Sequence, residues 1–159
     1  MDKIDFLEKN LGRQLAWIQA SDTRLALVLP LSTAMLGTLG ILAPAANSWP
    51  LCSEVITVFA VVLLSLSIFF CACASFPRTD GPKRSMIFFG RIATQKIDQF
   101  RDSVASLSDE EYIEDLTKQC HINAQVAMIK YIWVKRSLAS LFWATPPWAL
   151  AVYLLYVAK

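Results

Sequence analysis

Three stretches of this chain contain no charged side chain, and each is long enough to cross a lipid bilayer. They are 22, 22 and 21 residues long and occupy positions 25–46, 55–76 and 138–158. A helix needs roughly 20 apolar residues to cross the hydrocarbon layer, and backbone polar groups in lipid must be bonded within the segment. We therefore predict an all-α integral membrane protein with three transmembrane helices.

Because the three stretches carry no charge, all 28 acidic and basic residues lie in the other 94 positions. This segregation argues against an ordinary soluble globule and against a disordered chain. The net charge of +2 gives no reason to expect a nucleic-acid partner.

The distribution of basic residues predicts the orientation in the membrane. Residues 1–24 and 77–137 hold 14 of the 15 Lys and Arg residues, and residues 47–54 hold none. Because Lys and Arg concentrate on the cytoplasmic side, we expect the N-terminus and residues 77–137 to be cytoplasmic. Residues 47–54 then form a short external loop, and the C-terminus lies outside.

The N-terminal segment, residues 1–24, carries an amphipathic pattern. Its apolar residues recur at helical spacing, which predicts a helix leading into the first span. Such a helix either lies on the membrane surface or packs on another cytoplasmic helix, and packing is the simpler interpretation. The stripe consists of Ile4, Leu7, Leu11, Leu15 and Ile18.

The cytoplasmic region 77–137 carries a second apolar stripe at steps of three and four residues, which predicts a helix. An extended start at residues 85–89, with a break at Gly90, is the alternative. The stripe consists of Met86, Phe89, Ala93, Ile97, Phe100, Val104 and Leu107.

A capping box opens a further helix in this region. The Ser108 hydroxyl can accept from the N–H of Glu111, whose carboxylate can reach back to the N–H of Ser108. No Gly or Pro follows before Pro146, so we expect this helix to continue into the third span and to kink at Pro146 and Pro147.

The sequence offers no catalytic constellation. It has one histidine, His121, and no nucleophile–base pair, phosphate loop or zinc-ligand spacing. We therefore expect no enzyme activity, no metal and no catalytic residue. The first span does contain a row of small residues, Thr33, Gly37 and Gly40, that permits close helix approach. Intramolecular packing and self-association explain this row equally well.

Basic residues near the inner membrane surface suggest an anionic ligand. Positive-inside anchoring accounts for Lys135 and Arg136, whereas Arg91 and Lys130 lie further into the cytoplasmic region. A guanidinium can grip a phosphate, and an aromatic ring such as that of Phe89 can stack on a base.

Several short motifs follow one another along the chain: Trp17 with Asp22-Thr23-Arg24, then Phe88-Phe89-Gly90-Arg91-Ile92-Ala93, then Asp109-Glu110-Glu111-Tyr112, then Gln119, Asn123 and Ala127 ahead of Lys130-Tyr131. In this order they resemble the transmembrane effector family of Pycsar, the pyrimidine cyclase system for antiphage resistance in bacteria. The resemblance covers nearly the whole chain. It differs at Arg91, where a histidine or another polar residue is expected, and at Arg24, where lysine is more usual.

The resemblance implies a function and a set of binding residues. A companion pyrimidine nucleotide cyclase makes 3′,5′-cyclic UMP or 3′,5′-cyclic CMP, and the effector binds it and impairs the bacterial inner membrane, which causes abortive infection. The external loop is then periplasmic, and self-association of the effector stays open. The nucleotide-binding residues that the resemblance implies are Asp22, Arg24, Phe89, Gly90, Arg91, Gln119, Asn123 and Lys130.

A second interpretation remains beside the first. The chain would be a passive membrane subunit whose cytoplasmic helices dock a protein partner.

Overall fold

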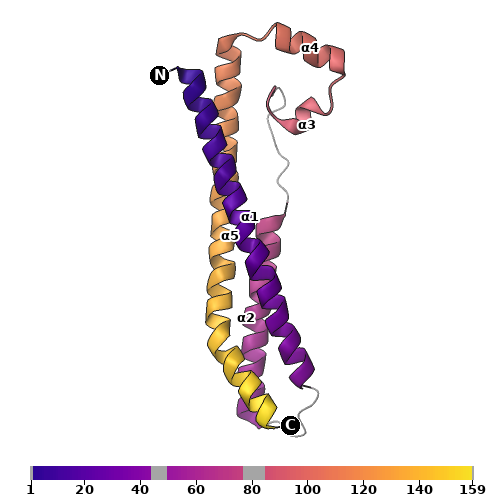
Figure 1. Cartoon of the computed structure of the whole chain (residues 1–159), viewed down its shortest axis with the longest axis vertical. Coiled ribbons are helices and arrows are strands. Elements are labelled where there is room, and N and C mark those ends of the chain that lie inside the picture. The colour runs from indigo at the N-terminus through magenta and orange to yellow at the C-terminus, as the bar shows by residue number, and fades with distance from the viewer. Residues whose placement is uncertain (1, 44–49, 77–84, 159) are drawn as a thin grey trace. The chain divides into compact units, whose positions relative to one another are not determined.

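Five helices make up the fold in the computed structural model, which describes residues 2–43, 50–76 and 85–158 (Figure 1). All regular structure in these residues is helical, which confirms the all-α prediction. Three of the helices, α1, α2 and α5, are long and apolar enough to cross a membrane. The helices are α1 (Lys3–Leu42), α2 (Leu51–Ser75), α3 (Phe89–Ile92), α4 (Ile97–Ala105) and α5 (Asp109–Val157).

The first two long helices differ in their bounds from the sequence expectation. Helix α1 joins the N-terminal segment to the first apolar stretch without a break and ends at Leu42; residues 44–46 of that stretch lie outside the described residues. Helix α2 begins at Leu51, within the expected loop 47–54. It begins there because the Pro50 carbonyl accepts hydrogen bonds from the N–H groups of Ser53 and Glu54, at 2.8 and 3.3 Å.

Helix α5 is continuous from Asp109 to Val157, as the sequence predicts. Its capping box is present, because the Ser108 N–H donates to Glu111 Oε2 at 3.1 Å and the Glu111 N–H donates to Ser108 Oγ at 3.3 Å. The helix passes through Pro146 and Pro147, and Figure 1 shows it bending in its yellow C-terminal part.

The expected single helix over residues 86–107 is wrong. Residues 85–88 are not helical, α3 is one turn long, and residues 93–96 separate it from α4. The break lies after α3 rather than at Gly90, which is inside it. At the break the Thr94 hydroxyl donates to the Arg91 carbonyl at 2.8 Å, and Lys96 is extended. Such a local side-chain bond offers the backbone an alternative to helical continuation.

The chain divides into two units, and α1 and α5 contribute residues to both. Of the described residues, unit 1 holds 2–20 and 85–129. Unit 2 holds 21–43, 50–76 and 130–158.

In unit 1 the start of α1 packs against the start of α5 (Figure 1). The Tyr112 hydroxyl donates to Glu8 Oε1 at 2.7 Å, and the Cys120 thiol donates to the Leu7 carbonyl at 3.4 Å. Four of the five stripe residues of this segment are at least half-buried, and Leu15 is exposed. These contacts favour helix packing over the membrane-surface alternative for this segment.

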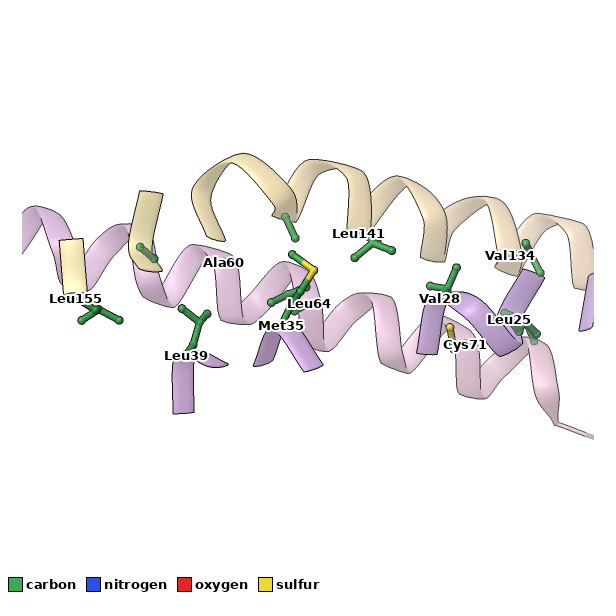
Figure 2. Close-up of a cluster of buried hydrophobic side chains, with 13 residues drawn as sticks. Leu25, Val28, Met35, Leu39, Ala60, Leu64, Cys71, Val134, Leu141 and Leu155 are labelled. Atoms are coloured by element: carbon green, nitrogen blue, oxygen red, sulfur yellow. The ribbon is translucent and has the colours of Figure 1, made fainter. Parts of the chain in front are cut away.

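Unit 2 is a bundle of three helices with a seven-residue repeat. On each helix the buried residues recur at steps of three and four, the pattern of left-handed coiled coils and of most transmembrane bundles. The exception is the step of seven from Ala144 to Ala151 of α5, where the half-buried Trp148 packs against the cluster. Figure 2 shows the apolar members converging between the helices. The buried residues are Ser21, Leu25, Val28, Ser32, Met35 and Leu39 of α1; Ser53, Thr57, Ala60, Leu64, Ser67, Cys71 and Ala74 of α2; and Val134, Ser137, Leu141, Ala144, Ala151 and Leu155 of α5.

The row of small residues in the first span lies on another face of α1. Thr33, Gly37 and Gly40 are exposed, and a Cβ atom added at either glycine would meet nothing within 4 Å among the described residues. Intramolecular packing therefore does not explain this row.

Candidate functional site

A buried carboxylate organises the segment that precedes α3 in unit 1. Asp115 of α5 is 7% exposed, and its Oδ2 atom accepts hydrogen bonds from the Ser85 hydroxyl at 3.0 Å and the Met86 N–H at 2.7 Å. The Ser85 oxygen accepts in turn from the N–H groups of Ile87 and Phe88 and from Gln119 Nε2 at 3.0 Å. Residues 85–88 are thereby held on α5.

This segment leads into a turn that carries three of the predicted binding residues, Phe89, Gly90 and Arg91. The rings of Phe88 and Phe89 pack with centroids 4.9 Å apart, and Phe89 is 67% exposed. A Cβ atom at Gly90 would lie 2.6 Å from Cε1 of Phe88, so glycine leaves room for the Phe88 ring over the backbone. The turn presents an aromatic face beside Arg91.

Two polar atoms of the same region are buried without a hydrogen-bond partner among the described residues. They are Nε of Arg91 and Oε1 of Gln95. Because the great majority of buried polar atoms in native proteins are paired, an unpaired donor and an unpaired acceptor need an explanation. The Arg91 atom is a hydrogen-bond donor and the Gln95 atom is an acceptor.

Gln119 and Asn123 lie one turn apart on α5 in unit 1. Gln119 is buried, and its amide nitrogen is engaged by Ser85. In this structure Gln119 is therefore a positioning residue for residues 85–88. Asn123 is half-buried.

The remaining predicted residues, Asp22, Arg24 and Lys130, belong to unit 2. Lys130 of α5 forms an ion pair with Asp22 of α1, and the Lys130 side chain is only 12% exposed. The Arg24 guanidinium lies 5.4 Å from the centroid of the Tyr131 ring, a cation–π distance. The ion pair thus joins α1 to α5 within this unit.

An open pocket of about 390 Å³ lies beside this ion pair. Its volume falls within the ~300–1,000 Å³ range of small-molecule sites. Its walls are mainly apolar, and Asp22 and Lys130 supply the charges. The lining residues are Asp22, Leu25, Ala26, Leu29, Cys71, Ser75 and Lys130.

The helix pair of unit 1 also shifts two ionisation equilibria. The hydrogen bond to Glu8 raises the pKa of Tyr112 to about 12, with burial and the negative charges of Glu8 and Asp115 adding to the effect. Burial raises the pKa of the Cys120 thiol, which lowers its thiolate fraction at neutral pH. Within the described ranges, no three His, Cys, Asp or Glu side chains form a group that could hold a metal ion.

Comparison with known families decides the assignment. The family model of the Pycsar effector protein domain, PycTM, matches residues 6–157. The chain belongs to this family. It is therefore an effector of antiphage defence, and its three apolar helices make it a membrane protein. No curated protein and no solved structure matches the chain.

Sequence reasoning on this Pycsar effector missed several residues that surround the predicted ones. Ser85, Asp115 and Gln95 in unit 1 are examples. The spacing of Asp115 and Gln119, four residues apart on one helix face, was the available signal, because a carboxylate and an amide at that spacing point the same way. Nothing local links them to Ser85, which lies 30 residues before Asp115.

Proposed function

We propose that a cyclic pyrimidine mononucleotide, 3′,5′-cyclic UMP or 3′,5′-cyclic CMP, binds this effector and causes it to impair the bacterial inner membrane. A companion cyclase supplies the nucleotide, and loss of membrane integrity ends the infected cell before phage are released. The protein acts by binding and does not convert the nucleotide chemically.

The observation that carries the proposal is that Nε of Arg91 and Oε1 of Gln95 are both buried without a hydrogen-bond partner in the described part of the chain. Arg91 brings a guanidinium, which binds phosphate oxygens, and Gln95 brings an amide oxygen, which accepts from a ring N–H or a hydroxyl. The exposed ring of Phe89 offers a stacking surface for a base. A cyclic mononucleotide carries all three matching groups.

Ligand binding favours whichever arrangement binds the nucleotide more tightly. The Asp115 and Gln119 contacts hold the segment before α3 in its observed form, which prepares the turn for binding. Within unit 2, the Asp22–Lys130 ion pair is a charged contact that an anionic ligand can disturb, because Lys130 can exchange one anionic partner for another.

The test uses the full chain in lipid vesicles with a potassium gradient and a voltage-sensitive dye. Addition of cyclic UMP or cyclic CMP should collapse the gradient, and cyclic AMP should not. Arg91→Ala should raise the nucleotide concentration needed for half-maximal leak about tenfold or more. Arg101→Ala, at an exposed arginine on α4, is the matched control and should leave the response unchanged.

Lys130→Ala tests the Asp22–Lys130 contact. Lys135→Ala is its control, because Lys135 is exposed on the same helix. If the protein is incorporated and neither cyclic UMP nor cyclic CMP makes the vesicles leak, the proposal is contradicted. A leak that both Arg91→Ala and Lys130→Ala leave unchanged contradicts the assigned contacts.

The proposed orientation places the N-terminus and residues 77–137 in the cytoplasm and the C-terminus in the periplasm. The excess of Lys and Arg in these segments supports it. In intact cells, a membrane-impermeant thiol reagent should then reach Cys52, near the external end of α2, but not Cys120. Labelling of Cys120 in intact cells would contradict this orientation.

The passive-subunit alternative finds support in α4, where Ile97 and Val104 are exposed. It predicts a protein that co-purifies with the chain in stable proportion and no leak on nucleotide addition. The vesicle experiment therefore separates the two functions.

A further inference from the structure

The inward face of α2 is unlike its outward face. Outward positions carry large apolar side chains that lipid can solvate, such as Val58, Phe59 and Phe69. The inward positions are all small, hydroxyl-bearing or thiol-bearing, apart from Leu64. We call this set the polar face of α2; it consists of Ser53, Thr57, Ala60, Leu64, Ser67, Cys71 and Ala74.

In the observed bundle, hydroxyls from all three helices meet on this face. Ser67 of α2 contacts the hydroxyl of Ser32 of α1 at 3.1 Å and that of Ser137 of α5 at 3.2 Å. The Cys71 thiol lies 3.0 Å from the Ser137 hydroxyl. All four side chains are buried. The three helices are therefore joined by polar contacts as well as by apolar packing.

Thr57, on the same face, is not satisfied by this arrangement. It is 5% exposed, and its hydroxyl oxygen is buried without a hydrogen-bond partner among the described residues. Thr33 and Thr38, outside the buried repeat of α1, instead donate to carbonyls of their own helix at 2.8 and 3.0 Å. Buried hydroxyls in proteins are normally paired, so burial without a partner is unfavourable for the Thr57 hydroxyl. A hydrogen bond to water would remove this cost.

We propose that the polar face of α2 lines the path for water and small ions in the activated state. In the observed state, the contacts among Ser32, Ser67 and Ser137 hold this face against α1 and α5. Separation of the helices would expose a row of hydroxyls to water and satisfy Thr57. The inference rests on the proposed function, because it states how that effector makes the membrane leaky.

The side chains of the polar face of α2 also determine which ions the path admits. It holds no Asp, Glu, Lys, Arg or His, so no fixed charge selects cations over anions. Rings of charged side chains are what usually give a pore that preference. The leak should therefore admit potassium and chloride at similar rates.

The native thiol of Cys71 provides the test. A variant with C52S, C73S and C120S keeps Cys71 as its one thiol, and it is reconstituted in vesicles with a cationic, membrane-impermeant methanethiosulfonate reagent. With activating cyclic nucleotide, Cys71 should react about tenfold or more faster than without it, because its buried population becomes water-accessible. Modification should also change the leak rate.

The matched control is the variant C52S, C71S and C120S, which keeps Cys73, two residues along α2 and off the polar face. Its reaction rate should not respond to the nucleotide. A second variant, Thr57→Val, keeps the shape of the side chain and removes the hydroxyl. It should insert and bind nucleotide normally but leak several-fold more slowly, since the path loses a polar group.

The outcomes separate the two proposals. A nucleotide-triggered leak with an unchanged Cys71 rate, or with equal acceleration at Cys73, overturns the pore-lining inference and leaves the proposed function standing. Absence of any nucleotide-triggered leak in the unmodified chain overturns both. Acceleration at Cys71 alone, together with a slower leak in Thr57→Val, supports the inference.

Discussion

Ser67 and Ser137 exchange two hydrogen bonds between α2 and α5. The Ser67 hydroxyl donates to the Ser137 carbonyl at 3.1 Å, and the Ser137 hydroxyl donates to the Ser67 carbonyl at 2.9 Å. Side-chain hydrogen bonds between membrane helices contribute on average about 0.6 kcal/mol each, less than their burial suggests. The pair therefore sets the registration of the two helices more than it sets the total stability.

Replacing the central serine tests this role. Ser67→Ala removes the donor to Ser137 and the contact with Ser32, and we expect it to lower the free energy of unfolding by about 1 kcal/mol. Because the closed bundle loses more than an opened one, half-maximal leak should need less nucleotide. Thermal unfolding in detergent and the vesicle assay measure the two effects. Ser65→Ala, on the exposed side of α2, is the control; equal effects of both variants would contradict the assignment.

Removing the buried carboxylate of unit 1 should loosen the segment before α3. Asp115→Ala leaves the Ser85 hydroxyl and the Met86 N–H without their acceptor, at a cost of about 1–3 kcal/mol. We expect faster amide hydrogen exchange at residues 86–88 and about tenfold weaker nucleotide binding, measured by calorimetry. Asp102→Ala, at an exposed carboxylate on α4, should change neither. Unchanged exchange at Met86 would show that the carboxylate does not hold this segment.

The Tyr112–Glu8 contact should make unit 1 sensitive to high pH. The pKa of Tyr112 is raised to about 12 from its ordinary value of 10.0 because the neutral hydroxyl donates to Glu8. A raised pKa in the folded state means that the contribution to stability is complete below pH 10. It is then lost as the pH rises toward 12.

Hydrogen exchange at the N-terminal part of α1, followed across this pH range, measures the loss. In Tyr112→Phe, the part of the pH dependence of exchange that arises from ionisation of Tyr112 should disappear. Below pH 10, the pH dependence of exchange should be the same as in the unchanged chain. An identical profile above pH 10 in both proteins would contradict the pairing.

The capping box at the start of α5 should contribute measurably to the stability of the first turn of the helix. In Ser108→Ala the Glu111 N–H loses its side-chain acceptor, and we expect a loss of about 1 kcal/mol, seen as faster exchange of the first amides of the helix. Ser106→Ala is the control, because the Ser106 hydroxyl bonds only to carbonyls at the end of α4. If both variants exchange alike, Ser108 does not cap the helix.

Local sequence patterns predict the parts of this fold that depend on neighbours along the chain. The absence of charge between residues 138 and 158 indicates the third apolar segment, and Ser108 with Glu111 indicates where α5 begins. The break after α3 is different, because the apolar spacing continues through Ala93 and Ile97. There the Thr94–Arg91 bond, invisible to a count of apolar positions, accompanies the break.

Contacts between distant residues could not be predicted in the same way. Asp22 and Lys130 are 108 residues apart, and only the family resemblance suggests that both belong to a site. Within the first span the small residues Gly37 and Gly40 mark a face that permits close helix approach, with intramolecular packing and self-association equally possible. The structure instead buries Ser32, Met35 and Leu39. Lipid is as apolar as these side chains, so hydrophobicity does not tell which face of a membrane helix packs inward.

The seven-residue repeat of unit 2 has a consequence for how chains of this kind can diverge. Each residue of a helix advances about 100° around the axis, so a single insertion between Ser67 and Cys71 would turn Cys71 and all later inward positions toward lipid. Exchanges of one apolar side chain for another on the outer face leave the repeat intact. Homologous chains should therefore tolerate many substitutions there, while gains and losses of single residues should be confined to the segments between the long helices.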